Sequence, residues 1–182
     1  VSSTAENTLS SLVSKFINDA KRQVEDSYSW NALTITLTVD TIPNIFNYAL
    51  TDSGARFKII EVYNGTDRHF MLPKSSRQMT QSYISSETPS NGTPAYYNFN
   101  GVNADGDTQV DIFPVPEKVY KLYFNMFLPQ PLLINDSDNM LVPSEPVVAL
   151  ALARSLVERG EDGGLANSEA YALYKNVLAD YI

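Results

Sequence analysis

The chain has 182 residues, a formal net charge of −8 and 43% hydrophobic residues, which suits one domain or two small ones that share a core. It has no cysteine and one histidine, His69, so disulfides, thiolate zinc sites, cysteine nucleophiles and histidine-rich metal sites are excluded. The basic residues are scattered and form no patch that would grip phosphates. No segment has the run of roughly 20 apolar residues that crosses a bilayer.

The first predicted element is a helix over Asn7–Tyr28, because its apolar residues recur at steps of three and four. The stripe consists of Leu9, Leu12, Val13, Phe16, Ile17, Ala20 and Val24. The opposite face carries Lys15, Asp19, Arg22 and Glu25, which we interpret as a solvated face.

The next hundred residues predict strands throughout. In Thr34–Asp40 threonines alternate with Ile35, Leu37 and Val39, which is typical of a half-buried strand. The segment 56–72 predicts a hairpin around Asn64-Gly65. Further strands are expected at 95–99, around Val110 and Ile112, and within 118–128, before Pro129 and Pro131. Some five to seven short antiparallel strands indicate a sandwich or an open barrel.

Two helices are predicted after the strands. The first runs from Glu145 to Arg159, with Ser144 as its N-cap and Gly160 as its C-cap. The second begins near Asn167 or Ser168 and runs to the end of the chain.

The order of elements predicts an α+β fold. The N-terminal helix (residues 1–30) and the C-terminal helices (132–182) would form one three-helix bundle. The antiparallel β-sandwich or barrel block (31–131) would be inserted between them.

The sequence contains no complete catalytic or metal-binding motif. Asn103, Asp105 and Asp107 alternate like calcium ligands, but an EF-hand needs Gly at loop position six and Glu at twelve, and neither is there. We interpret this stretch as a hairpin turn and His69 as a surface or edge residue. A carboxylate-pair hydrolase stays open only because 21 acidic residues always offer some pair. We expect no enzyme activity, no cofactor and no metal.

The helix after residue 144 is apolar at every position from Val147 to Ala153. Two helical neighbours cover only part of such a helix, so the remaining side must lie against the β block or against another copy of the chain. We expect self-association, since fully burying each aliphatic side chain contributes roughly 1.5–3 kcal/mol. The expected subunit or portal interface comprises Val148, Leu150, Leu152, Leu156, Tyr171, Tyr174, Leu178 and Tyr181.

The layout resembles the head-to-tail adaptor (connector) proteins of short-tailed bacteriophages, of the tail tubular protein A type. The most specific segments are "PVPEKVYKLYF" (114–124), "LVPSEPVVALALA" (141–153) and "ERGEDGG" (158–164). The resemblance implies a virion structural protein, assembled in the host cytoplasm and located in the phage neck. It implies a homo-oligomeric ring of twelve copies between the portal protein and the tail nozzle protein.

DNA would pass through that ring without specific binding, and no membrane would be involved. The family docks on the portal through its C-terminal segment, which corresponds here to Tyr171–Ile182. The alternative is a carbohydrate- or receptor-binding β module of a phage tail, suggested by the surplus of tyrosine and phenylalanine in the β block, with Tyr96 and Tyr97 as its test residues.

Overall fold

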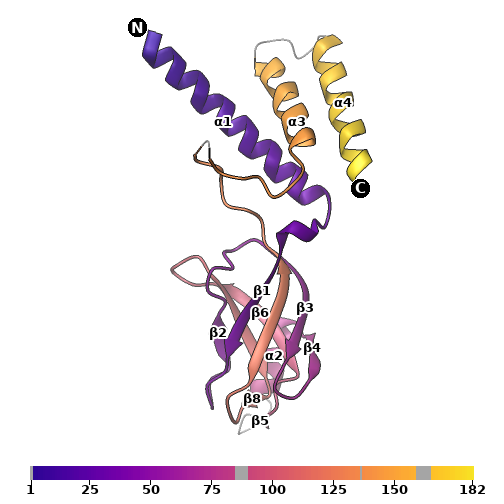
Figure 1. Ribbon diagram of the computed structural model, residues 1–182. Helices are drawn as coiled ribbons and strands as arrows, with labels where there is room; N and C mark the ends of the chain where they lie inside the picture. The colour runs from indigo at the N-terminus through magenta and orange to yellow at the C-terminus, as the bar shows by residue number, and fades with distance from the viewer. Residues whose placement is uncertain (1, 85–89, 136, 159–164) are drawn as a thin grey trace. The chain divides into compact units, whose positions relative to one another are not determined.

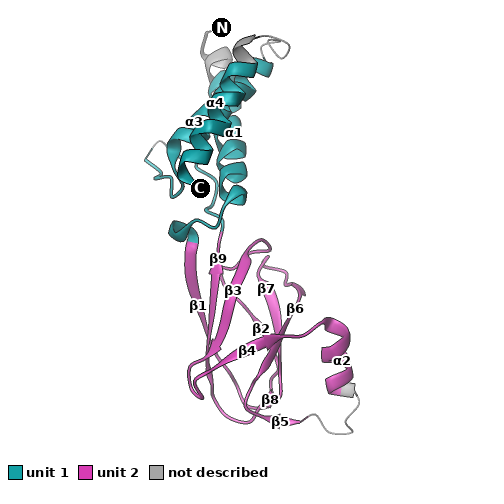
Figure 2. Cartoon of the chain, turned by 90° about the vertical axis from the view of Figure 1, so that its right-hand side faces the viewer, with its two compact units in different colours: residues 1–33, 129–182 teal, residues 34–128 magenta. Residues whose placement is uncertain are grey.

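The computed structural model describes residues 2–84, 90–135, 137–158 and 165–182 (Figure 1). The chain folds into two compact units with mixed α and β structure (Figure 2). Unit 1 combines residues 1–33 with 129–182, and unit 2 is the continuous segment Thr34–Leu128. Unit 1 is thus built from both ends of the chain.

Three helices make up most of unit 1. They are α1 (Ser2–Ser27), α3 (Ser144–Leu156) and α4 (Leu165–Tyr181), and a short 3-10 helix, η1 (Asn31–Leu33), follows α1. Helix α3 packs against both α1 and α4 (Figure 1). Its N-cap is Pro143, which has no side chain able to cap, so the prediction of Ser144 as N-cap is wrong by one residue. The predicted C-cap, Gly160, lies outside the described residues.

One face of α1 binds the extended segment that follows Pro129, a contact that the sequence analysis did not predict. Lys21 is 1% exposed, and its ammonium donates to the carbonyl oxygens of Gln130 and Pro131, both at 2.7 Å. Glu25 is also buried, lies 3.3 Å from the ammonium and accepts from the Gln130 amide at 3.2 Å. The expectation that Glu25 belongs to a solvated face is therefore wrong.

Asn18 extends this polar contact by one helical turn. Its side-chain oxygen accepts from the Leu133 amide at 2.8 Å, and its side-chain nitrogen donates to the Leu133 carbonyl at 3.0 Å. Because Asn18, Lys21 and Glu25 are spaced by three and four, they lie on one helix face. They hold the segment 130–133 against α1 by backbone recognition.

Unit 2 is built around a seven-stranded sheet in the order β1-β9-β3-β4-β6-β7-β2. Its strands are β1 (Thr34–Asp40), β2 (Asn47–Ala49), β3 (Lys58–Asn64), β4 (His69–Pro73), β6 (Tyr96–Val102), β7 (Thr108–Phe113) and β9 (Lys121–Phe127). The short strands β5 (Asn91–Gly92) and β8 (Val115–Pro116) form a separate pair.

The sequence predicts antiparallel strands, but two of the strand pairs in unit 2 are parallel. Strands β4 and β6 run parallel, with Leu72 opposite Tyr96, and β5 and β8 are also parallel. A parallel pair needs a crossover connection, and the segment between β4 and β6 supplies it.

The core of unit 2 lies between the inward faces of these strands. On β9 the inward residues Leu122, Phe124 and Met126 are fully buried. The other buried members are Leu50, Val62, Met71, Tyr97, Val110, Ile112 and Tyr120. Along β9 fully buried residues alternate with less buried ones, so one side of the strand faces the core.

Helix α2 (Ser76–Ile84) lies in the crossover and contradicts the expectation of strands throughout. Met79 and Tyr83, one turn apart, attach it to the sheet: Met79 is buried, and the Tyr83 hydroxyl donates to the Ile112 carbonyl at 2.5 Å. The Tyr83 ring also packs edge-on against Phe113. Because so few apolar residues attach this helix to the sheet, its sequence lacks the apolar periodicity that would predict a helix.

The predicted hairpin at Asn64-Gly65 is present between β3 and β4. The Asn64 side-chain oxygen accepts from the amides of Thr66 and Asp67, both at 3.1 Å. A Cβ at position 65 would collide with the ring of Tyr123. Glycine is required here by close packing against β9.

We expect Lys21→Ala to destabilise unit 1 by about 3 kcal/mol, because it leaves the Glu25 carboxylate buried without its ammonium partner and frees two carbonyl oxygens. Trp30 is the single tryptophan and lies in unit 1, so its fluorescence during urea unfolding reports on this unit separately from unit 2.

Lys15→Ala is the matched control, because Lys15 is an exposed lysine on the same helix. It should change the free energy of unfolding by less than about 0.5 kcal/mol. Equal effects of the two substitutions would contradict the role given to Lys21.

The stability of unit 2 should fall at alkaline pH partly through Tyr83. Burial, and then the charge of Asp111, raise the pKa of the Tyr83 hydroxyl well above its ordinary value of 10.0. The folded unit therefore favours the neutral hydroxyl, and this stabilisation is complete below pH 10.0 and is lost as the pH rises above it. Tyr83→Phe should weaken this alkaline loss, measured by urea unfolding followed by circular dichroism; an unchanged slope would refute it.

Candidate functional site

The candidate site is the side of α3 that neither α1 nor α4 covers. Val148 and Leu152 are 63% and 49% exposed. They lie four residues apart and hence on one helix face, with the half-buried Leu156 one turn further along. We call Val148, Leu152 and Leu156 the α3 face. It is apolar over three successive turns.

The other side of α3 is buried inside the chain's own helical unit. Val147, Leu150 and Ala153 are each at most 3% exposed. Leu150, which the sequence assigned to an interface, is therefore not accessible to a partner. The sequence alone could not separate Leu150 from Leu152, because both belong to the same unbroken apolar run.

The residues expected on the last helix divide in a similar way. Tyr174 is buried at 4% exposure, packs against Tyr171 with ring centroids 5.8 Å apart, and is also not accessible. Burial raises the pKa of its hydroxyl. Tyr171 and Tyr181 are exposed at 42% and 43%, and Leu178 is half-buried.

Tyr181 joins the end of α4 to the start of α3. Its hydroxyl donates to the Glu145 carboxylate at 2.8 Å, and this hydrogen bond raises the pKa of the Tyr181 hydroxyl. Glu145 lies in the first turn of α3, where a negative charge is favoured by the helix dipole.

Beside this contact lies an open hollow of about 600 Å³ within unit 1, which the sequence did not reveal. Tyr28 and Trp30 line it from the end of α1, with their rings edge to face at 5.3 Å, and Leu141 and Glu145 line it from the start of α3. The Trp30 ring nitrogen donates to the Val24 carbonyl at 2.8 Å, so this ring is fixed in place.

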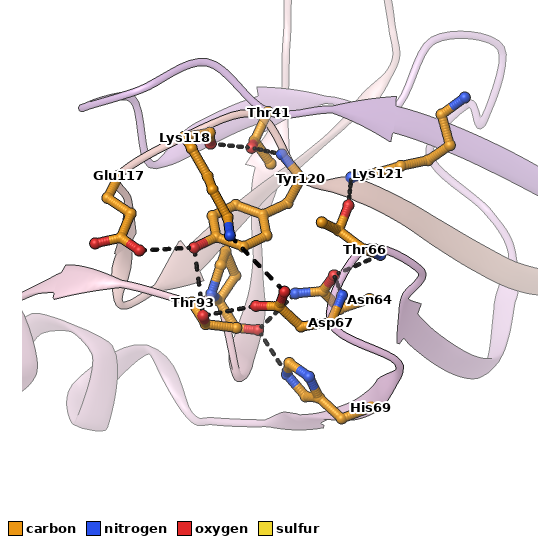
Figure 3. Close-up of polar contacts among 11 residues, drawn as sticks. Thr41, Asn64, Thr66, Asp67, His69, Thr93, Glu117, Lys118, Tyr120 and Lys121 are labelled. Carbon is orange, nitrogen blue, oxygen red and sulfur yellow. Dashed lines mark hydrogen bonds and ion pairs between the residues drawn. The ribbon is translucent and has the colours of Figure 1, made fainter.

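A second polar cluster surrounds the β3–β4 turn of unit 2 (Figure 3). Thr93 donates to the Asp67 carboxylate at 2.7 Å and lies 3.3 Å from the Tyr120 hydroxyl. Tyr120 in turn donates to Glu117 at 3.3 Å, and Lys118 lies 4.0 Å from Asp67. These contacts bind the turn to the segment before β6 and to the start of β9.

His69 belongs to the same cluster but is used structurally. Its Nε2 lies 2.9 Å from the Pro94 carbonyl oxygen, and Asn64 reaches the same oxygen at 3.5 Å. A carbonyl can only accept, so the histidine nitrogen donates. The cluster fixes backbone positions, and its geometry does not align a base with a nucleophile.

Within the described ranges, no three His, Cys, Asp or Glu side chains come together in a way that could hold a metal ion, and none of the helices has the length and apolar character needed to span a bilayer. Tyr97 is 6% exposed in the core, and Tyr96 lies under the Lys74 ammonium at 4.0 Å. Tyr97 is therefore not available to stack on a sugar, whereas Tyr96, the other test residue of the carbohydrate-binding alternative, is half-buried.

No protein-family model matches the chain, and no curated protein matches it.

Thr93→Val keeps the shape of residue 93 and removes the hydroxyl that joins Asp67 to Tyr120. We expect unit 2 to lose about 1 kcal/mol of stability, since one hydrogen bond to a carboxylate is lost. Urea unfolding followed by circular dichroism measures this. Thr38→Val, at an exposed strand position, is the control and should be close to neutral; a neutral result for Thr93→Val would show that the cluster does not hold the turn.

Proposed function

We propose that this protein is a structural, ring-forming head-to-tail adaptor of a short-tailed bacteriophage, which joins the portal protein to the tail nozzle protein. The ring comprises twelve copies and surrounds the DNA channel in the neck of the virion, after assembly in the host cytoplasm. It performs no catalysis and needs no cofactor or metal.

The observation that supports this proposal best is the α3 face. Val148 and Leu152 leave two neighbouring aliphatic side chains exposed on one helix face, and contiguous exposed apolar residues mark interaction sites. In a ring, the face of one copy lies against a different surface of the next copy, and the rotation closes the assembly.

The charge of the chain agrees with a conduit for DNA. The net charge of −8 makes the average surface repulsive to phosphates, so DNA is not held as it passes. A specific DNA-binding protein would instead need lysine and arginine clusters.

The proposed architecture is a three-helix bundle made by residues 1–30 and 132–182, with residues 31–131 inserted as a β-sandwich or barrel domain. The helical bundle would carry the ring contacts and, through Tyr171 and Tyr181 on α4, the contact with the portal. Both tyrosines are exposed, which suits a docking surface.

Size-exclusion chromatography with light scattering tests this proposal, on the pure chain and with portal rings of the phage that encodes it. The wild type should form a ring alone or on the portal. Val148→Ser/Leu152→Ser should weaken the association by on the order of 100-fold, because two aliphatic side chains no longer gain from burial.

Phe70→Ser/Leu72→Ser is the matched control, because these two side chains on β4 are similarly exposed, at 60% and 58%, but lie in unit 2. This variant should assemble like the wild type. A wild-type chain that stays monomeric in both conditions and does not bind the portal would overturn the proposal.

A further inference from the structure

Strand β1 forms one edge of the seven-stranded sheet (Figure 2). Within the described part of the chain, β9 is the strand that pairs with it, in an unbroken register from Thr34 opposite Phe127 to Asp40 opposite Lys121. The opposite edge, β2, has only 3 residues against 7 in β1. The sheet therefore has one long edge and one short edge.

The direction of the free backbone groups on β1 follows from contacts on the other side of β9. The Lys121 carbonyl accepts from Gly65 and its amide donates to the Thr66 hydroxyl, so the backbone of Lys121 faces β3. In an antiparallel ladder the bonding direction alternates. Leu122, Phe124 and Met126 therefore bond to β1, at Val39, Leu37 and Ile35.

It follows that the amides and carbonyls of Thr34, Thr36, Thr38 and Asp40 point away from β9, along the free edge. Proteins usually block such edges with Lys, Pro, a bulge or a very short strand. Strand β1 has none of these: it is regular, and Asp40 at its end is its one charged residue. Its inward residues Ile35, Leu37 and Val39 are only half-buried, whereas those of β9 are fully buried.

We propose that β1 pairs with β1 of a second copy of this chain, antiparallel, about a twofold axis at Leu37. This register places Thr36 opposite Thr38 of the second copy, Ile35 opposite Val39, and Thr34 opposite Asp40. All seven residues of β1 are then paired. The residues whose amides and carbonyls lie on the free edge come directly opposite one another, so each such pair exchanges two N–H···O hydrogen bonds.

The strand is complementary to itself in three ways. The pairing keeps apolar residues on the inward face and threonines on the outward face, where Thr–Thr pairs are favourable. The two Asp40 carboxylates lie at opposite ends, so no like charges meet. A slip by one residue would bring apolar side chains opposite threonines on the wrong face. Strand β1 of a second copy is therefore a better partner for β1 than strand β2, which has only three residues.

Cross-linking between cysteine variants tests the register, because the wild-type chain has no cysteine. Thr36→Cys and Thr38→Cys chains, mixed under mild oxidation, should form a disulfide-linked dimer, since directly opposite residues lie within disulfide range. Each variant alone should form little, because position 36 does not lie opposite itself. Equal cross-linking in the mixture and in each variant alone, or none in any of them, would overturn the proposal.

A charge pair gives a second, independent measurement. Thr36→Lys/Thr38→Lys places like charges opposite each other and should raise the dimer dissociation constant about tenfold or more in sedimentation equilibrium. Thr36→Lys/Thr38→Glu is the matched control, with opposite charges across the axis, and should keep the dimer. Loss of the dimer in both variants, or in neither, would contradict the twofold register.

This contact goes beyond the proposed ring and can fail separately from it. Both measurements are repeated in the Val148→Ser/Leu152→Ser background, where the α3 face is removed. Cross-linking between positions 36 and 38 should persist there. Its disappearance together with the ring would show that β1 has no contact of its own and would overturn this inference.

Discussion

The structure depends on one geometric constraint: α3 is apolar on every side but has two helical neighbours. Helices α1 and α4 bury Val147, Leu150 and Ala153, while Val148 and Leu152 remain in water. Burying an aliphatic side chain contributes roughly 1.5–3 kcal/mol, so a partner that covers this face gains more than any surface ion pair would give. This imbalance supports the proposed contact between subunits.

The sequence predicts those parts of the fold that depend on local periodicity. The alternation in β1, the strand within residues 118–128, the helix after residue 144 and the hairpin at Asn64-Gly65 are all present where expected. It does not predict which side of α3 is free, because that depends on where α1 and α4 pack. Leu150 and Tyr174 were assigned to the interface for this reason, and the structure buries both.

The other wrong predictions have a different cause: they depend on contacts between segments that are distant in the chain. Glu25 was expected on a solvated face, but it is buried beside Lys21, whose partners are carbonyls 109 and 110 residues further along the chain. Helix α2 needs only Met79 and Tyr83 to attach it to the sheet, and the parallel pairing of β4 with β6 follows from that crossover. Backbone carbonyls leave no trace in composition or spacing, so no pattern in the residues could reveal these contacts.

The most direct measurement is the reactivity of a cysteine placed at position 152, in a chain that otherwise has none. Leu152→Cys should react rapidly with a maleimide in the free monomer, because position 152 is half exposed. It should become protected when the chain is assembled in rings or bound with portal. Equal labelling rates in the free and assembled states would contradict the claim that a neighbouring copy covers the α3 face.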